Sequence, residues 1–301
     1  MGRKELAQID LHHWDRSTTE ECEELALIVG KELPPMFRFA RLETHTLGKQ
    51  HHRVAFYSWT PSGIDYDKQV REFALIPGGS VTLGYDREQG FIPTSSQLQS
   101  WQQETMDPEK YGYTYSLETY LDRVLTPLRQ VQIKPFLLET VTDSHNDVLN
   151  YDGVHWVNPY SSSDKAALQA PQIKDDFRLP TSDEWEYACG AGARTLFRWG
   201  DETPDMPIKR RAEAQVASGD WDFYARPNAF GLMIANDPFR WEFCDSPGIM
   251  RGGDHGMAMQ SSMGIFAEWT TLATAYHLNV VQNLAPGKLY YAHLRRAFSL
   301  A

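Results

Sequence analysis

The stretch that decides the fold of this chain reads RLPTSDEWEYA and covers residues 178–188. Its first half is typical of a helix start, because the Thr181 side chain can cap the backbone and Glu184 stands three residues later, the spacing of a capping box. Trp185 and Ala188 then begin an apolar face at helical spacing. The sequence therefore predicts a capped helix with one apolar face, followed closely by RWGD at residues 198–201.

The same residues also form a recognisable pattern. Residues 178–188 and 198–201 resemble the R-L-P-T-E-x-E-W-E-Y-A and W-G-D signature of the formylglycine-generating enzyme superfamily, also called the sulfatase-modifying-factor family. Further segments match in family order: FALIPGG at 73–79 with LG at 83–84, VQIKPF at 131–136 as one strand, NAFGL at 228–232, WEFC at 241–244 and RGG at 251–253. At the end, Ala297-Phe298 is followed by Ser299, where the family usually has arginine. The resemblance spans about residues 71–301.

The resemblance implies an α+β fold that is irregular and loop-rich and is related to C-type lectins. The composition agrees, because 21 glycines and 17 prolines favour turns and loops. Members of the family carry out protein thiol oxidation, C–S bond formation in ergothioneine biosynthesis, or ligand display without catalysis. The function of this chain therefore has to be inferred from its site residues.

Residues 1–70 are predicted to form an α-β-β extension packed on a main domain at 71–301. Thr18-Thr19-Glu20-Glu21 offers a capping box, and apolar residues recur at helical spacing from there to Pro34-Pro35. Residues 36–44 and 53–60 alternate apolar and polar residues around a turn at 47–50, which is typical of a hairpin. No linker rich in Gly, Ser or Pro precedes Phe73, so independent movement of the extension is not expected.

Residues 89–129 are interpreted as an insertion between two strands of the family. The second half predicts a helix that is capped by Ser116 and has one apolar face. The first half is rich in aromatic residues, an enrichment that suits either interior packing or a recognition surface. The candidates for contact with a partner are Trp101, Tyr111 and Tyr113.

The site residues of the resembling oxidases are missing from this chain. In those copper-dependent enzymes, two cysteines a few residues after R-G-G bind Cu(I) as thiolates, and the metal activates O₂ for attack on a substrate cysteine. After Arg251-Gly252-Gly253 this chain reads DHGMAMQSSM over residues 254–263, and no cysteine follows. Met257 and Ser262 stand at the approximate places of the two thiols. Formylglycine generation by this chemistry is therefore not expected.

A rearranged metal site is the alternative. Met257, Met259 and Met263 offer thioether sulfur to Cu(I), although methionine is also a common filler of packed pockets. His255, Glu268 and His277, with His293 as a further candidate, provide the ligand types of a non-haem iron site, although their spacing is not diagnostic. If the chain is an oxidase, the residues expected to carry the reaction are His255, Met257, Glu268 and His277.

Calcium is a third candidate metal. Family members bind structural calcium through the asparagine and glutamate that flank G-N-x-W-E, and Glu242 matches the glutamate while Asn236 is a candidate for the asparagine. Asp237-Pro238-Phe239-Arg240 interrupts the motif by an apparent insertion of one residue. A salt bridge from Glu242 is the competing interpretation.

Charge and composition exclude several classes of function. The net charge of −11 argues against a nucleic-acid ligand, because phosphate binding needs clustered lysine and arginine. No apolar run approaches the length that spans a membrane, and the amino terminus lacks the features of a secretory signal, so a cytoplasmic location is expected. Three dispersed cysteines, Cys22, Cys189 and Cys244, favour neither disulfides nor a zinc site.

The sequence thus favours a non-catalytic protein that binds another protein and requires no cofactor. Superfamily members without the cysteine pair include immunity proteins that neutralise toxins of bacterial type VI secretion systems, and this chain resembles them in that respect. The concrete hypothesis is an immunity protein that covers a cognate toxin. The competing hypothesis is an oxidase or oxygenase that uses iron or copper in a rearranged site.

Overall fold

A five-stranded antiparallel sheet in the order β1-β2-β3-β6-β12 forms one end of the molecule in the computed structural model. The structure describes residues 6, 9–61, 70–88, 90–102, 116–144, 176–208, 222–246, 248–260, 263–279 and 293–300. The strands of this sheet are β1 (Phe37–Leu47), β2 (Gln50–Trp59), β3 (Arg71–Ile76), β6 (Phe136–Glu139) and β12 (Ala297–Ser299).

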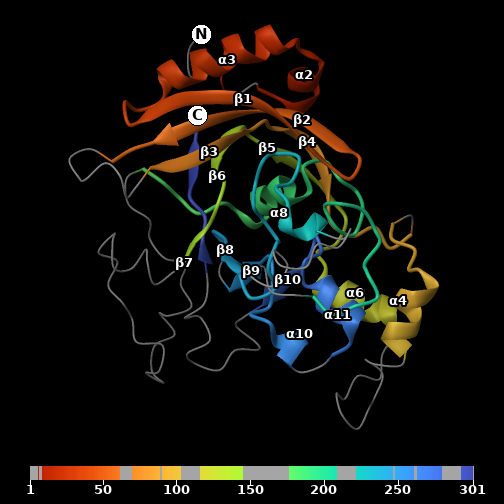
Figure 1. Cartoon of the computed structure of the whole chain (residues 1–301). Helices are drawn as coiled ribbons and strands as arrows, with labels where there is room; N and C mark the ends of the chain where they lie inside the picture. The colour runs from red at the N-terminus through yellow and green to blue at the C-terminus, as the bar shows by residue number, and fades with distance from the viewer. Residues whose placement is uncertain are drawn as a thin grey trace, which may run out of the picture.

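The capping box predicted at Thr18 and the hairpin that follows it are both present. Thr18 caps α3 (Thr19–Glu32), and the Glu21 side chain accepts a hydrogen bond from the Thr18 backbone in return. β1 and β2 pair through a turn at 47–50, and β2 continues the sheet by pairing with β3. In Figure 1, α3 and the short α2 (Leu11–Arg16) cover the outer face of this sheet. The N-terminal segment and the matched family segments therefore share one sheet.

Both faces of the sheet are buried, and the alternation of side chains shows why. Ala55 and Tyr57 of β2 face the helix α3 in one apolar cluster, whereas Val54 and Phe56 face a second cluster on the opposite side. Neighbouring residues of a strand point to opposite faces, so a strand buried on both faces reads as a nearly continuous apolar run. On the second side the sheet packs against α8 (Ser182–Gly190), which lies beneath it in Figure 1.

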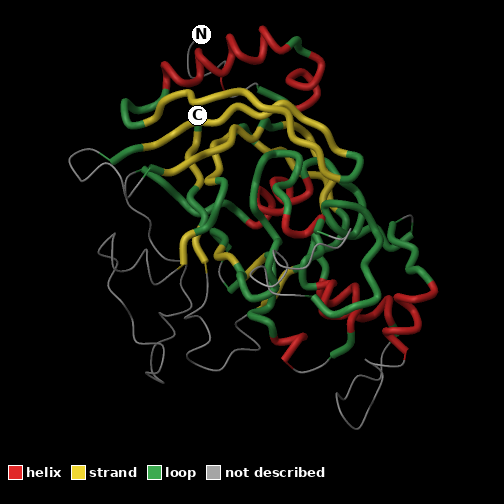
Figure 2. The backbone as a smooth tube through the Cα atoms, viewed as in Figure 1, coloured by secondary structure: helices red, strands yellow, loops and turns green. Residues whose placement is uncertain are grey.

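Two smaller sheets and a group of short helices complete the described fold. β4 (Gly79–Leu83) pairs with β5 (Arg129–Ile133), and the second five-stranded sheet has the order β10-β9-β8-β11-β7. Its strands are β10 (His277–Asn279), β9 (Ile249–Arg251), β8 (Glu242–Phe243), β11 (His293–Leu294) and β7 (Asp143–Ser144). The helices α4 (Ser95–Ser100), α6 (Leu117–Val124), α10 (Met257–Gln260) and α11 (Ile265–Thr270) gather at the end opposite α3. Much of the remaining described chain is loop, as Figure 2 shows.

Two expectations about local structure have clear outcomes. Ser116 caps α6, as predicted, and the Leu117, Tyr120 and Leu121 side chains of this helix are buried. The single strand expected over residues 131–136 is wrong, because β5 ends at Ile133 and β6 begins at Phe136 in a different sheet. Pro135 lacks a backbone N–H and so cannot continue a ladder of hydrogen bonds.

No helix in the described part of the chain is long and apolar enough to span a membrane.

Candidate functional site

Helix α8 carries the signature residues Glu184, Trp185 and Glu186, and all three side chains point into the protein. Thr181 is the N-cap, and its hydroxyl accepts a hydrogen bond from the Glu184 N–H at 3.2 Å, which confirms the predicted capping box. Every residue of the helix from 184 to 190 is buried. Each of the three side chains bonds a different partner, so the signature residues connect α8 to the rest of the fold.

Glu184 holds the segment that precedes α8 through Arg178. The Arg178 guanidinium donates to both carboxylate oxygens of Glu184, at 2.6 and 2.7 Å. Arg178 Nε also donates to Ser299 Oγ at 2.8 Å. Ser299 stands where the family usually has arginine, and here its hydroxyl completes the set of acceptors around Arg178. The first connection of α8 thus runs to the last strand of the large sheet.

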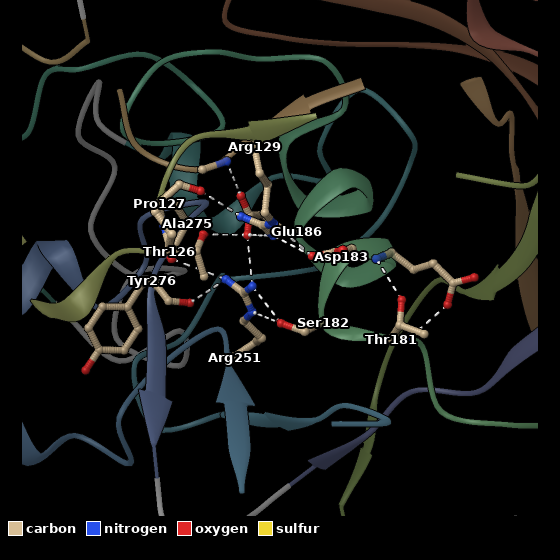
Figure 3. Close-up of polar contacts among 12 residues, drawn as sticks. Thr126, Pro127, Arg129, Thr181, Ser182, Asp183, Glu186, Arg251, Ala275 and Tyr276 are labelled. Atoms are coloured by element: carbon tan, nitrogen blue, oxygen red, sulfur yellow. Dashed lines mark hydrogen bonds and ion pairs between the residues drawn. The ribbon is translucent and has the colours of Figure 1, made fainter. Parts of the chain in front are cut away.

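Glu186 lies at the centre of the second and largest network (Figure 3). Its side chain is 1% exposed, and its Oε1 accepts a hydrogen bond from the Gly84 backbone at 2.6 Å. Its Oε2 accepts from Arg251 at 2.8 Å, from Arg129 at 2.9 Å and from the Thr126 hydroxyl at 2.7 Å. Both oxygens are therefore fully used, as a buried charge requires.

The charge on Glu186 is maintained by its neighbours. Burial by itself raises the pKa of this carboxyl, but the Arg251 and Arg129 guanidinium groups outweigh it and hold the pKa below its ordinary value. Two cations share this one buried carboxylate, and Asp183 supplies a second acceptor to Arg129. The ionised carboxylates and guanidinium groups therefore form a hydrogen-bonded network that connects α8 to other elements.

Arg251 connects this network to the RGG segment at residues 251–253. Its guanidinium is 0% exposed and donates to Ser182 Oγ and to the backbone carbonyls of Ala275 and Tyr276. Gly252 follows with φ +78°, and a Cβ there would lie 2.8 Å from the Trp185 ring. The arginine therefore links α8 to strand β9, and the glycine allows Trp185 to pack against the turn.

Glu242, the candidate calcium ligand, forms the third connection of α8. The Arg295 guanidinium donates to both of its carboxylate oxygens at 2.8 Å, and Trp185 Nε1 donates to Oε2 at 2.8 Å. Glu242 is 3% exposed and Arg295 is 0% exposed, so the pair is fully buried. The salt bridge of the competing interpretation is present, and calcium binding at Glu242 stays a prediction. The second candidate ligand, Asn236, is also buried, at 6% exposed.

The loop that follows Gly253 has structural roles at its first residues. The Asp254 carboxylate accepts hydrogen bonds from the backbone N–H groups of Met257 and Ala258 at 2.9 and 2.7 Å, so it caps α10. His255 has φ +63° and stacks on Trp241, with ring centroids 5.7 Å apart. Met259 and Met263 pack against the apolar cluster that contains Phe266 and Trp269. Met257 and Ser262, where the resemblance implies the two family thiols, carry no sulfhydryl group, and Ser262 lies outside the described residues.

The candidate oxidase residues come from separate elements. His255 lies in the loop, Met257 begins α10, Glu268 lies on α11, and His277 begins β10. Burial lowers the pKa of His277, and the neighbouring Arg251 lowers it further. Within the described residues, no group of three or more His, Cys, Asp or Glu side chains is placed to hold a metal ion. The structure does not bring His255, Glu268 and His277 together as one such group.

The three cysteines are inaccessible in the fold. Cys22, Cys189 and Cys244 are free thiols and are each at most 1% exposed. Burial raises the pKa of Cys189 to about 12, and burial also raises the thiol pKa of Cys22 and Cys244. Thiolate chemistry requires exposure and a lowered pKa, and these residues have neither.

Only one of the aromatic partner candidates lies in the described part of the chain. Trp101 is 3% exposed and packs against Tyr120, with ring centroids 4.8 Å apart. The packing interpretation therefore describes Trp101, since this indole is covered by α6. Tyr111 and Tyr113 lie outside the described residues.

Sequence reasoning missed the inward charges. Arg129, Arg251 and Arg295 received no role from the sequence, although in the structure Arg129 and Arg251 are the counter-ions of Glu186 and Arg295 is the counter-ion of Glu242. The sequence did indicate a buried charge, because Glu186 lies between apolar residues of the predicted helix. The residues around it in α8 are all buried in the structure. An acidic residue in such a position needs a cationic partner somewhere in the chain.

The chain matches the model of a known protein family. The model of the sulfatase-modifying factor enzyme 1-like domain matches residues 63–233, more than half of the chain. The matched region contains α8 and ends before the WEFC and RGG segments and the loop at 254–263. No curated protein matches this chain.

Proposed function

This chain belongs to the sulfatase-modifying factor enzyme 1-like family, within the formylglycine-generating enzyme superfamily, and on that premise we propose that it is a non-catalytic member that binds another protein. The observation that carries the proposal is the content of the loop at residues 254–263. This loop contains no cysteine, and Asp254 and His255 are engaged in capping and stacking.

The rest of the chain supplies no replacement nucleophile of the same kind. The only three cysteines in the sequence are buried, and burial raises the pKa of each thiol. Thiol oxidation by the family's copper chemistry uses thiolate ligands, which are strongly disfavoured at these positions. A scaffold that keeps the signature helix and lacks reactive thiols is suited to binding, and the family's expected relation to C-type lectins supports display of loops.

The concrete form of the proposal is an immunity protein that neutralises a bacterial toxin, such as one delivered by a type VI secretion system, by direct contact in the cytoplasm. The net charge of −11 supports a basic partner, because complementary charge speeds association and disfavours wrong partners. The same charge disfavours nucleic acid. In this proposal the partner contact needs no cofactor.

Co-expression with a partner tests the proposal. The toxin-like product of a neighbouring reading frame is expressed in cells with and without this protein, and survival is measured together with complex formation by size-exclusion chromatography. We expect rescue and a stable complex. The matched variant replaces His255, Met257 and Met259 with alanine, and it should rescue equally well. Rescue that is abolished in this variant while its fold is retained would favour the oxidase alternative.

A further inference from the structure

The two edges of the large sheet differ in the part of the chain that the structure describes. At the β12 edge, the Arg178 N–H donates to the Ala297 carbonyl at 2.9 Å, and the Ala297 N–H donates to the Arg178 carbonyl at 2.8 Å, so a further segment covers this edge. At the opposite end of the strand order, β1 pairs with β2 and with no other described strand. Figure 1 shows β1 below α3, which covers a face of the sheet and not this edge. Strand β1 is therefore an open edge.

The turn after β1 determines which backbone groups of this edge are available. Leu47 and Gln50 face each other across a two-residue turn, and the residues that flank such a turn form a hydrogen-bonded pair. Bonding alternates along an antiparallel ladder, so residues 45, 43 and 41 also bond β2. The N–H and C=O groups of residues 42, 44 and 46 then point away from β2. No described backbone group outside the hairpin bonds them.

The devices that protect edge strands are absent from most of β1. Natural edges are blunted by proline, by lysine or by a bulge that interrupts regular pairing. The bulge of β1 lies near its start, between Phe39 and Arg41. From there, residues 41–47 read RLETHTL, contain neither proline nor lysine, and keep a regular register with β2. This stretch is suited to accept another strand.

The charges of the stretch favour a second copy of the same chain. The Arg41 and Glu43 side chains lie on one face of β1, are 39% and 46% exposed, and contact each other at 2.8 Å. If two copies of β1 pair antiparallel about Leu42, Arg41 of each copy lies opposite Glu43 of the other, and the two Leu42 side chains meet. Pairing centred on Arg41 or on Glu43 would instead put like charges opposite each other, which destabilises a sheet.

We propose that two copies of this chain form a dimer by antiparallel pairing of their β1 edges about Leu42, so that the two large sheets become one continuous sheet. The Leu42 N–H of each copy donates to the Leu42 carbonyl of the other. The charges of Arg41 and Glu43 alternate around the two-fold axis between the copies. Both copies use the same surface, so the assembly closes at a dimer. The dimer goes beyond the proposed binding function, because it forms without any other protein.

Sedimentation velocity of the wild-type chain over a range of concentrations tests the dimer itself. The net charge of −11 on each copy opposes association, so the measurement is made at physiological ionic strength, where charges more than about 8 Å apart are largely screened. We expect a shift from the mass of one chain to the mass of two as concentration rises. The mass of a single chain at every concentration would overturn the proposal.

A charge swap tests the pairing about Leu42. Arg41→Glu and Glu43→Arg each put like charges opposite each other twice, so each variant alone should raise the dissociation constant of the dimer by about tenfold. An equimolar mixture of the two variants restores opposite charges across the edge and should form heterodimers, which native mass spectrometry detects. Recovery in the mixture also shows that neither variant has lost its hairpin.

The matched control is Glu72→Gln. Glu72 lies on β3 and accepts a hydrogen bond from Arg41 within the chain, so this variant removes a contact of Arg41 without touching the β1 edge. It should dimerise like wild type. Dimers that persist unchanged in Arg41→Glu and in Glu43→Arg, or a mixture that forms no heterodimer, would contradict the register about Leu42.

Amide hydrogen exchange locates the interface on the backbone. The Leu42 N–H points away from β2 and should exchange rapidly in dilute protein, and it should become protected at concentrations where the dimer forms. The neighbouring Glu43 N–H bonds β2 and should be protected at both concentrations. Rapid exchange of the Leu42 N–H in a sample that is fully dimeric would place the dimer contact elsewhere and overturn the proposal.

The same measurement identifies a different occupant of the edge. A chain that stays monomeric and whose Leu42 N–H becomes protected only when another protein is bound would have β1 paired with a strand of that protein. This result would refute the dimer and leave the proposed binding function in place. Conversely, a dimer with a protected Leu42 N–H stands even where no toxin is neutralised.

Discussion

Helix α8 and the loop at residues 254–263 differ in how their charged and polar side chains are used. In α8, Trp185 and Glu186 contact elements far along the chain: Trp185 donates to Glu242 of β8, and the buried Glu186 carboxylate accepts from Arg251 and Arg129. The loop contacts nearby groups: Asp254 caps the next helix, and His255 stacks on Trp241. α8 therefore joins distant elements through buried charges, whereas the described loop residues cap a helix, stack on one ring and pack against an apolar cluster.

This difference separates the scaffold of the family from its chemistry. The residues that define the signature are the ones that pair buried charges, so a chain can keep them for folding alone. The loop at 254–263, where the resemblance implies the thiol chemistry, lies beyond the matched region and contains no cysteine. Family membership therefore establishes the fold of this chain, whereas its function has to be inferred from particular residues, including those of the loop.

The largest effect is expected at the centre of the α8 network. Glu186→Gln keeps the shape of the side chain and removes its charge, which leaves Arg251 buried without its carboxylate. Breaking a buried ion pair in this way costs about 3–5 kcal/mol of the free energy of unfolding. Urea denaturation monitored by tryptophan fluorescence measures the loss.

The matched control is Asp183→Asn, which contacts the same Arg129 from a side chain that is 37% exposed. Exposed pairs contribute about 0–1 kcal/mol, so this variant should unfold nearly like wild type. If the two variants lost similar stability, burial would not be what distinguishes the α8 network.

The pH dependence of stability distinguishes α8 from the loop, because the pKa of one carboxyl in α8 is lowered and the pKa of one carboxyl in the loop is raised. The pKa of Glu186 lies below its ordinary 4.5, so the stability from its charge is present above that pH and is lost as the pH falls through the lower folded value. Burial raises the pKa of Asp254 from 3.8 to about 6. The folded protein then binds a proton that the unfolded chain releases, so the contribution of this carboxyl to stability falls by about 2 kcal/mol as the pH rises from 4 to 6.

Urea unfolding at pH values from 4 to 7 separates the two contributions. Asp254→Asn cannot ionise, so the difference in unfolding free energy between wild type and this variant should decline as the pH rises from 4 to 6 and level off towards pH 7. A difference that rises over this interval would show that the charged form of Asp254 stabilises the fold and that the assigned sign is incorrect.

Replacement of the loop side chains should have a smaller effect. The variant with alanine at His255, Met257 and Met259 loses one ring stack and two half-buried side chains, which corresponds to about 1–2 kcal/mol. Chemical denaturation measures this loss, and the variant should remain folded. A loss as large as that of Glu186→Gln would place the loop in the same structural class as α8.

The smallest effect is expected from thiol reagents. Because Cys22, Cys189 and Cys244 are buried and the pKa of each is raised, a disulfide reagent such as DTNB should label none of them in native protein and all three after denaturation. Rapid labelling of one thiol under native conditions would reveal a reactive cysteine and reopen thiol chemistry.

The sequence predicted local elements better than long-range contacts. Thr181 with Glu184 and Thr18 with Glu21 signalled helix starts correctly, because capping depends on residues three positions apart. The break between β5 and β6 was missed at Pro135, although a proline in a strand favours such a break. Glu186 and Arg251 pair although they are 65 positions apart in the sequence, and the residues around each of them do not indicate which arginine pairs with which carboxylate.

The most direct test of the account is dioxygen uptake by protein prepared without a metal-affinity tag and loaded anaerobically with Cu(I) or Fe(II), with a cysteine-containing peptide as substrate. If the protein is non-catalytic, dioxygen uptake should be no faster than that of the metal and peptide without protein, and it should not differ between wild type and the His255→Ala variant. Uptake above this background that disappears in His255→Ala, with the variant still folded, would contradict it and would identify the loop at 254–263 as an active site.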